Sequence, residues 1–250
     1  MKEVVLVTGA GKGLGRVIAK TLLDKGLIVY GTYRSSDKSK IRGVTYLKMD
    51  VTSDKECKST VAKILKEEKR INILINCAGI TVSGPTLDYS SDDFMRVLDT
   101  NVVGAFRLIK FAQNSKLRLI INITSLNGFL SLPNYGLYSS SKFAIEALGK
   151  ALKCELQPKV KVVNIAPGAL HNKNQAKKMT RKPIRERFPL VNFLLPLTKM
   201  EDVAGVIVKL IDKKSVPSRI IVGRDAMIIN IFQKILPQFV LDKLFANMTK

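Results

Sequence analysis

Short apolar segments alternate with longer amphipathic segments along almost the whole chain of 250 residues. The short segments are rich in β-branched residues, and most are continuously apolar, as in VVLV, INILIN and LIINI. This pattern is typical of strands that are covered by helices on both faces. Because strands that alternate with helices form right-handed βαβ units, the sequence predicts an α/β fold with a doubly wound parallel sheet. We expect one domain spanning residues 1–250.

The alternation also gives approximate bounds for each element. The predicted strands are residues 3–8, 27–32, 44–49, 71–77, 118–124, 160–165 and 219–222. The predicted helices are residues 14–25, 53–69, 91–114, 138–156 and 200–212. Two segments fall outside this pattern. Residues 168–197 form a long loop that we expect to act as a substrate lid, and residues 225–250 form an apolar tail that Pro237 should divide into two short helices.

The chain is strongly basic, with 42 Lys and Arg residues against 20 Asp and Glu residues and a net charge of +22. Such a charge is found in nucleic-acid-binding proteins and in proteins attracted to anionic surfaces. The lysines, however, are scattered through the chain, and no basic–aromatic recognition motif accompanies them. We therefore expect no specific nucleic-acid partner, and a basic nucleic-acid-associated protein stays an alternative.

Other features exclude several classes of protein. No apolar run reaches the ~20 residues of a membrane-spanning helix, and the N-terminal segment does not resemble a signal peptide. Three widely spaced cysteines suit a reducing cytosol, so we expect a cytoplasmic protein. The single histidine, His171, excludes a zinc site built on paired histidines and makes a Ser-His-Asp triad improbable. We expect no metal site.

A glycine-rich turn, TGAGKGLG at residues 8–15, follows the first predicted strand and leads into a helix. In this geometry the backbone approaches a pyrophosphate closely, and the helix N-terminus favours the anion. Because no Ser or Thr follows Lys12, a P-loop nucleotidase is disfavoured. The residues expected to bind a dinucleotide here are Gly9, Gly11, Lys12, Gly13, Leu14 and Gly15.

The end of the second predicted strand indicates which dinucleotide is bound. An acidic residue there would bind a ribose 2′-hydroxyl and repel a 2′-phosphate. The sequence instead reads Tyr33-Arg34-Ser35, which offers a guanidinium group and a hydroxyl group for a phosphate, with Lys12 as a second cation. The cofactor predicted from these residues is NADP(H). The alternative is that both cations are ordinary solvated surface residues.

Tyr138 and Lys142 are four residues apart near the start of a predicted helix, which places both side chains on one face. An ammonium group close to a phenol favours the phenolate, so Tyr138 is a candidate general acid/base. Ser125 follows the predicted strand at 118–124, where its hydroxyl could donate to a substrate carbonyl.

In their order and spacing, these motifs resemble the short-chain dehydrogenase/reductase family over residues 3 to 223. They comprise the turn at 8–15, Asp50-Val51, Asn76-Cys77-Ala78-Gly79, Asn101, Ser125, Tyr138 with Lys142, and Pro167-Gly168. The resemblance implies that Tyr138 donates a proton to the carbonyl and that Ser125 holds and polarises it. It also implies that Lys142 binds the nicotinamide ribose and that Asn101 holds a water of a proton relay.

The resemblance implies cofactor contacts for a second group of residues. Asp50 with Val51 would bind the adenine; Asn76, Ala78 and Gly79 would line the adenosine ribose and the central strand; and Pro167 with Gly168 would close over the nicotinamide. Two departures from the family pattern are Cys77, which replaces an Asn, and the absence of the usual Thr after Gly168, for which His171 or Asn172 could substitute. Cys77 is expected to be a packing residue rather than a reactive thiol. Tyr135 lacks a lysine four residues on, so we expect it to line the substrate pocket.

The expected function is NADPH-dependent reduction of a ketone to an alcohol, or the reverse oxidation. Seven cations within residues 173–187 favour an anionic substrate, such as an acyl-carrier or lipid-like ketone. A small-ketone or steroid-type dehydrogenase and a non-catalytic NADP-binding regulator are alternatives. The family implies a homodimer or homotetramer. The apolar tail packs against its own domain or a sister subunit, or contacts a membrane surface.

Overall fold

The fold was obtained as a computed structural model, which describes residues 1–35, 41–170, 197–237, 239–240 and 243. Most of the expected lid, including His171, Asn172 and the cations at 173–187, lies outside the described residues. So does much of the C-terminal tail after Pro237.

The described residues form the predicted parallel sheet, with seven strands in the order β3-β2-β1-β4-β5-β6-β7. The order reverses between β1 and β4, and ligands of doubly wound sheets bind at such a switch point. The strands are β1 (Val4–Val7), β2 (Ile28–Tyr33), β3 (Thr45–Lys48), β4 (Ile73–Asn76), β5 (Leu119–Ile123), β6 (Lys161–Pro167) and β7 (Arg219–Val222). Each coincides with a predicted strand, and the prediction of the fold class is confirmed.

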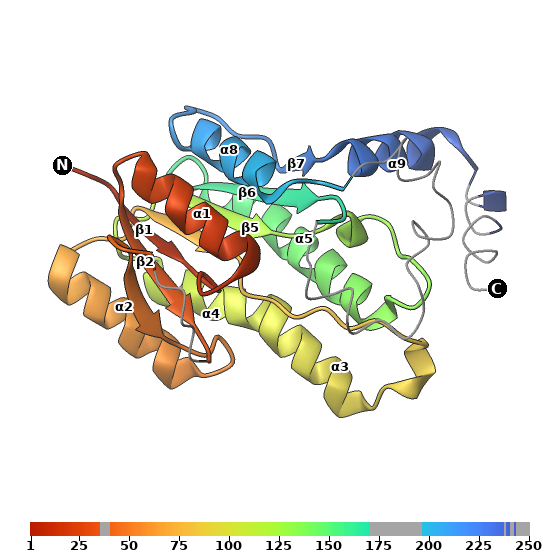
Figure 1. Cartoon of the computed structure of the whole chain (residues 1–250), viewed down its shortest axis with the longest axis horizontal. Coiled ribbons are helices and arrows are strands. Elements are labelled where there is room, and N and C mark those ends of the chain that lie inside the picture. The colour runs from red at the N-terminus through yellow and green to blue at the C-terminus, as the bar shows by residue number, and fades with distance from the viewer. Residues whose placement is uncertain (36–40, 171–196, 238, 241–242, 244–250) are drawn as a thin grey trace.

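Helices cover both faces of the sheet (Figure 1). Helices α1 (Gly13–Asp24) and α8 (Met200–Ile211) cover one face, while α2 (Asp54–Glu68), α4 (Gly104–Ala112) and α5 (Gly136–Leu156) cover the other. Alternate residues of each strand enter opposite cores: Val5 and Val7 of β1 face α1 and α8, whereas Val4 and Leu6 face α2 and α4. This is why the central strands are almost entirely apolar.

The predicted single helix at 91–114 is wrong, because it divides into two helices. Helix α3 (Ser91–Leu98) starts with a capping box between Ser90 and Asp93, and α4 starts at Gly104. Between them, Asp99–Val103 form a π-helical turn in which the Gly104 N–H donates to the Asp99 carbonyl. Such wide turns are frequent at functional sites, and this one contains Asn101.

Helix α9 (Arg224–Ile235) ends before Pro237, as the sequence predicts. It follows β7 directly and packs over the short 3₁₀ segment η3 (Leu126–Gly128) and the loop after it. Within the described part of the chain, no helix is both long and apolar enough to cross a membrane.

Candidate active site

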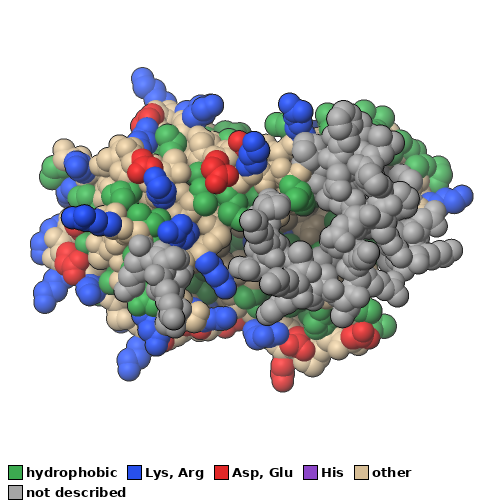
Figure 2. Space-filling model, viewed as in Figure 1, with side chains coloured by type: hydrophobic (Ala, Val, Ile, Leu, Met, Phe, Trp, Pro, Cys, Tyr) green, Lys and Arg blue, Asp and Glu red, His purple; other side chains and the backbone are tan. Residues whose placement is uncertain are grey.

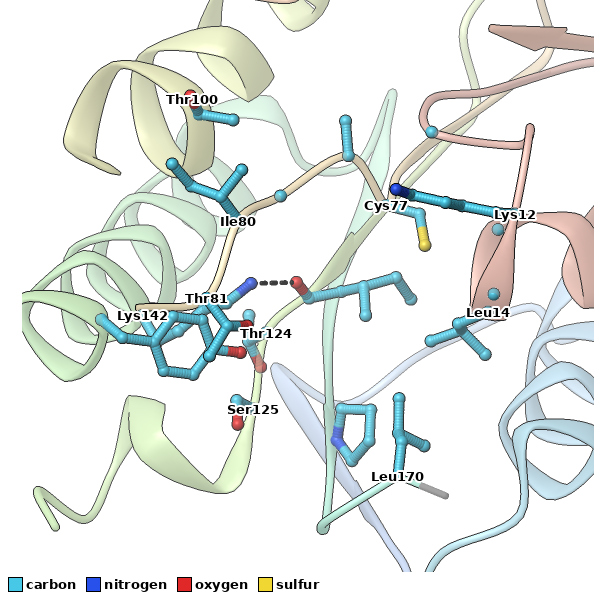
Figure 3. A pocket seen from close by; sticks show the side chains of 18 of the residues that line it. Lys12, Leu14, Cys77, Ile80, Thr81, Thr100, Thr124, Ser125, Lys142 and Leu170 are labelled. Carbon is cyan, nitrogen blue, oxygen red and sulfur yellow. Dashed lines mark hydrogen bonds between the residues drawn. The ribbon is translucent and has the colours of Figure 1, made fainter. Parts of the chain in front are cut away.

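A cavity of about 820 Å³ lies at the carboxyl ends of the strands and brings together most of the residues expected from the sequence. It is lined by Gly9, Gly11, Lys12, Gly13, Leu14, Gly15, Tyr33, Arg34, Ser35, Asp50, Val51, Ala78, Gly79, Ser125, Tyr135, Tyr138, Lys142, Pro167 and Gly168. Figure 3 shows Lys142 and Ser125 on one side of the cavity, with Lys12 and Leu14 on the other. The glycine-rich turn and the Ser-Tyr-Lys group therefore face one continuous space.

The glycine-rich turn is held against the end of β4. The Thr8 hydroxyl accepts hydrogen bonds from the backbone N–H groups of Cys77 and Ala78, both at 2.9 Å. Gly9 has a φ of +68°, and a Cβ there would lie 2.9 Å from the Ala78 Cα, so a larger residue is excluded. No side chain caps the start of α1 at Lys12. Its first N–H groups are thus left for an anionic ligand, and the turn fits a dinucleotide pyrophosphate.

Helix α5 and strand β5 position the three candidate catalytic side chains. Ser125 follows β5, and its hydroxyl accepts a hydrogen bond from the Asn127 N–H at 3.2 Å. The buried Lys142 ammonium donates to the Ile123 carbonyl at 3.0 Å, the bond drawn in Figure 3. It lies 5.6 Å from the centre of the Tyr138 ring, so the four-residue spacing places the two groups together as expected.

Tyr135 packs edge-to-face against Tyr138, with 6.4 Å between the ring centres. Burial raises the pKa of the Tyr135 phenol, and the neighbouring Tyr138 raises it further. Tyr135 is therefore held as a neutral hydrogen-bonding group beside Tyr138. This position agrees with its expected place in a substrate pocket.

Asn101 does not line the cavity but connects two of its walls. Its side-chain oxygen accepts from the Ile80 N–H at 2.8 Å, and its side-chain nitrogen donates to the Ile80 carbonyl and to the Ser141 hydroxyl, both at 2.9 Å. The Ser141 hydroxyl in turn donates to the Tyr138 carbonyl at 2.7 Å. Asn101 thus fixes the loop after β4 relative to the turn of α5 that carries the candidate catalytic residues.

Asn76, expected to line the adenosine ribose and the central strand, is buried at the end of β4 and does not line the cavity. Its amide donates to Asn122 at 2.9 Å, and the Asn122 amide donates to Asn164 at 3.1 Å. These three asparagines are neighbours in the register of β4, β5 and β6. Asn164 continues the row to the buried Glu146, which also accepts from Thr124 and Arg219. The sequence signal for this row is one asparagine in each of the three neighbouring strands β4, β5 and β6.

The cavity is also lined by apolar residues that the sequence analysis does not identify and by Cys77, which it expects to be a packing residue. Leu126, Leu132, Leu170 and Met200 give the cavity apolar walls. They come from three separated segments, so no local motif marks the set. The half-buried Cys77 also lines the cavity, and burial raises the pKa of its thiol to about 12. A thiol with so high a pKa is unreactive near neutral pH, which supports the expected packing role.

Comparisons with known proteins place this geometry in context. Residues 3–183 match the family model described as short chain dehydrogenase. A 3-ketodihydrosphingosine reductase of Bacteroides thetaiotaomicron is 34% identical over 171 residues, covering 66% of this chain and 63% of that protein. A 3-oxoacyl-[acyl-carrier-protein] reductase of Synechocystis is 29% identical over 220 residues, covering 82% of this chain and 87% of that protein.

Among solved structures, ElxO with NADP bound is 27% identical, with a TM-score of 0.78, and the match covers 90% of this chain and 98% of that one. The match to the 3-ketodihydrosphingosine reductase spans less than two thirds of that protein's length. The matches to the other two proteins span most of theirs.

Proposed function

The chain belongs to the short-chain dehydrogenase family, and from this premise we propose that it is an NADPH-dependent carbonyl reductase. It would convert a ketone to an alcohol by hydride transfer, or catalyse the reverse oxidation. The observation that carries the proposal is one cavity lined both by the glycine-rich turn and by Ser125, Tyr138 and Lys142. Two of the relatives are named as reductases of keto compounds, which supports the same reaction class.

The preference for NADPH over NADH rests on charge. Arg34 and Ser35 line the cavity directly after β2, and Lys12 lines it from the glycine-rich turn. A guanidinium, a hydroxyl and an ammonium group would together hold a 2′-phosphate. The bound NADP of the similar ElxO structure supports this choice. Asp50 with Val51, Ala78 with Gly79, and Pro167 with Gly168 would contact the rest of the dinucleotide.

The chain's own residues would handle the carbonyl oxygen. NADPH, when bound, would supply the hydride that the carbonyl carbon accepts. The Tyr138 hydroxyl would give its proton to the carbonyl oxygen, and the Ser125 hydroxyl would donate a hydrogen bond to the same oxygen. The Lys142 ammonium, anchored on the Ile123 carbonyl, would stabilise the negative charge left on Tyr138.

The walls of the cavity favour an apolar substrate. Leu126, Leu132, Leu170 and Met200 line the same cavity as Ser125 and Tyr138 and add no charge to it. A 3-keto compound with a long acyl chain, free or attached to an acyl carrier, would fit both these walls and the names of the two relatives. We therefore propose a lipid-like 3-keto substrate.

We also propose that the protein assembles as a homodimer or homotetramer. Phe106 of α4 and Phe143 of α5 are each 44% exposed. These helices lie on the same face of the sheet, and contact with a second copy would remove both rings from water.

One experiment tests the cofactor and the reaction together. NADPH fluorescence measures binding, and its loss with a 3-ketoacyl thioester measures turnover, in the wild type, Tyr138→Phe and Arg34→Asp. Tyr138→Phe should lower turnover by about 10²–10⁴-fold and leave NADPH binding unchanged, because only proton transfer is lost. Arg34→Asp should weaken NADPH binding by about tenfold or more while NADH binding is retained.

Matched variants separate these effects from general damage. Tyr89→Phe removes a hydroxyl outside the cavity, and Arg42→Asp reverses an exposed charge outside it, so neither should alter binding or turnover. Equal affinity for NADPH and NADH, unchanged by Arg34→Asp, would show that Arg34 is only a surface charge. If the wild type binds neither nucleotide, the reductase proposal is wrong.

A further inference from the structure

Helix α9 exposes a row of large apolar side chains on its outer side. Met227, Ile231, Phe232 and Ile235 are 51%, 53%, 52% and 71% exposed, and Phe239, just beyond Pro237, is 73% exposed. Figure 2 shows hydrophobic side chains gathered at the end of the molecule where α9 lies in Figure 1. Exposed apolar residues are common singly, but a row of them along one helix marks an interaction surface.

The inner side of α9 is firmly attached, so the helix cannot simply turn this row inwards. Ala226 has no exposed surface, and Ile229 packs with it against Leu126 and Phe129. The Gln233 amide donates to the Phe129 carbonyl at 2.5 Å. The outer row is therefore left to a partner outside the described part of the chain.

The charges beside the row indicate which partner it suits. Arg224, Lys234 and Lys243 are exposed, and in the described part of residues 224–243 the sole carboxylate is that of Asp225, which is fully buried. The whole chain carries +22. A second copy would bring the same cations to the interface and repel the first, whereas anionic headgroups would neutralise them while the apolar side chains enter the acyl region.

We propose that α9 docks this protein on the surface of an anionic lipid bilayer. The helix has 12 residues and is about 18 Å long, too short to span a hydrocarbon core of about 30 Å, so it lies in the interface. Exposed apolar side chains with flanking cations are the composition of such interfacial helices.

The placement of α9 gives this docking a consequence that rests on the proposed function. The inner side of the helix contacts Leu126, which follows Ser125 and lines the cavity. A docked bilayer would thus be separated from the cavity wall by one helix, a diameter of about 10 Å. A lipid-like ketone could then reach Ser125 and Tyr138 from the bilayer without crossing bulk water.

Co-sedimentation with vesicles tests the docking directly and needs no enzymatic turnover. Vesicles of phosphatidylcholine alone are compared with vesicles that also contain phosphatidylglycerol, at low and high salt. The wild type should bind the anionic vesicles. The double variant Ile231→Gln/Ile235→Gln should bind them about tenfold or more weakly, since two buried apolar contacts are lost. Arg224→Gln/Lys234→Gln should weaken binding about thirtyfold at low salt.

The control variant Leu87→Gln/Met95→Gln removes two exposed apolar side chains far from α9 in the sequence and should bind like the wild type. All variants should keep the wild-type melting temperature, because the altered side chains face solvent.

Equal vesicle binding by the α9 variants and the wild type overturns the proposal, as does a wild type that does not bind anionic vesicles. If the wild type does not bind vesicles, and its molecular mass in solution is halved in Ile231→Gln/Ile235→Gln, the proposal is wrong and the row instead contacts a second copy of the chain. If the wild type binds vesicles but never oxidises NADPH, the docking proposal stands and the proposed reductase activity is wrong.

Discussion

Asp225 has no exposed surface, yet its carboxylate joins two segments that are distant in the sequence. It accepts hydrogen bonds from the Ala169 N–H at 2.7 Å and from the Thr198 hydroxyl at 3.0 Å. Thr198 is itself tied to Ala169 by a 2.9 Å backbone hydrogen bond. The approach is so close that a Cβ on Gly168 would lie 2.0 Å from the carboxylate. Since Pro167 and Gly168 line the cavity, Asp225 is a positioning residue for the expected nicotinamide wall.

Asp225→Asn tests this role. The amide presents an N–H group where the carboxylate accepted two hydrogen bonds, and losing one charged hydrogen bond costs about 1.5–3 kcal/mol. We expect NADPH to bind about tenfold more weakly, as measured by nicotinamide fluorescence at a temperature where the variant is fully folded. The control is Asp202→Asn, which changes an exposed carboxylate in the first turn of α8. A lower melting temperature with unchanged NADPH affinity would assign Asp225 to stability alone.

Helix α5 is the element that connects the candidate site to the sheet, and Gly149 permits its close approach to β6. A Cβ at Gly149 would lie 2.1 Å from the side-chain oxygen of Asn164, which belongs to the row of asparagines across the sheet. Gly149→Ala should therefore lower the free energy of unfolding by about 1–3 kcal/mol through overpacking. In α8, a Cβ at Gly205 meets no atom within 4 Å. Gly205→Ala should instead raise stability by about 0.5–1 kcal/mol. Urea unfolding measures both, and equal effects would contradict the packing argument.

The elements also show what could be predicted from the sequence. The strands could be predicted, because their apolar runs are local and the central strands β1, β4, β5 and β6 are buried on both faces. The division of residues 91–114 into α3 and α4 could not be predicted, because the segment is amphipathic throughout. Its wide turn contains Asn101, which contacts Ile80, 21 positions away. Likewise, the glycine-rich turn and Ser125 directly follow strands, and Tyr138 and Lys142 are four residues apart in one helix, so these motifs are visible locally. Leu170 and Met200, by contrast, come to line one cavity only in the folded chain.

For the whole molecule, the free energy of unfolding at alkaline pH depends on two opposing effects, one from surface lysines and one from buried cysteine and tyrosine side chains. The net charge of +22 means that losing protons from lysines relieves repulsion. Buried ionisable side chains have the opposite effect, because they favour the unfolded chain as the pH rises. Burial raises the pKa of Cys57 and of Cys77 to about 12. Burial also raises the pKa of Tyr30, which donates to Glu67 and Glu68. Near pH 9.5 only about one lysine in ten has lost its proton, whereas a cysteine in the unfolded chain is mostly ionised. The effect of the buried cysteines on stability should therefore exceed that of the lysines.

A cysteine whose pKa is higher in the folded state stabilises the protein fully below the unfolded pKa of about 8.5, and this contribution is lost as the pH rises towards 12. Each such group gives a slope of about 1.4 kcal/mol per pH unit. The free energy of unfolding should thus fall between about pH 8.5 and 10.

In Cys57→Ala the fall should be shallower by the slope of one group, even though the variant starts less stable because a buried side chain is truncated. Replacing the exposed Cys154 by Ala should leave the wild-type slope. Urea unfolding at stepped pH measures all three slopes. Parallel curves for the wild type and Cys57→Ala would mean that the Cys57 thiol ionises as readily in the folded protein as in the unfolded chain.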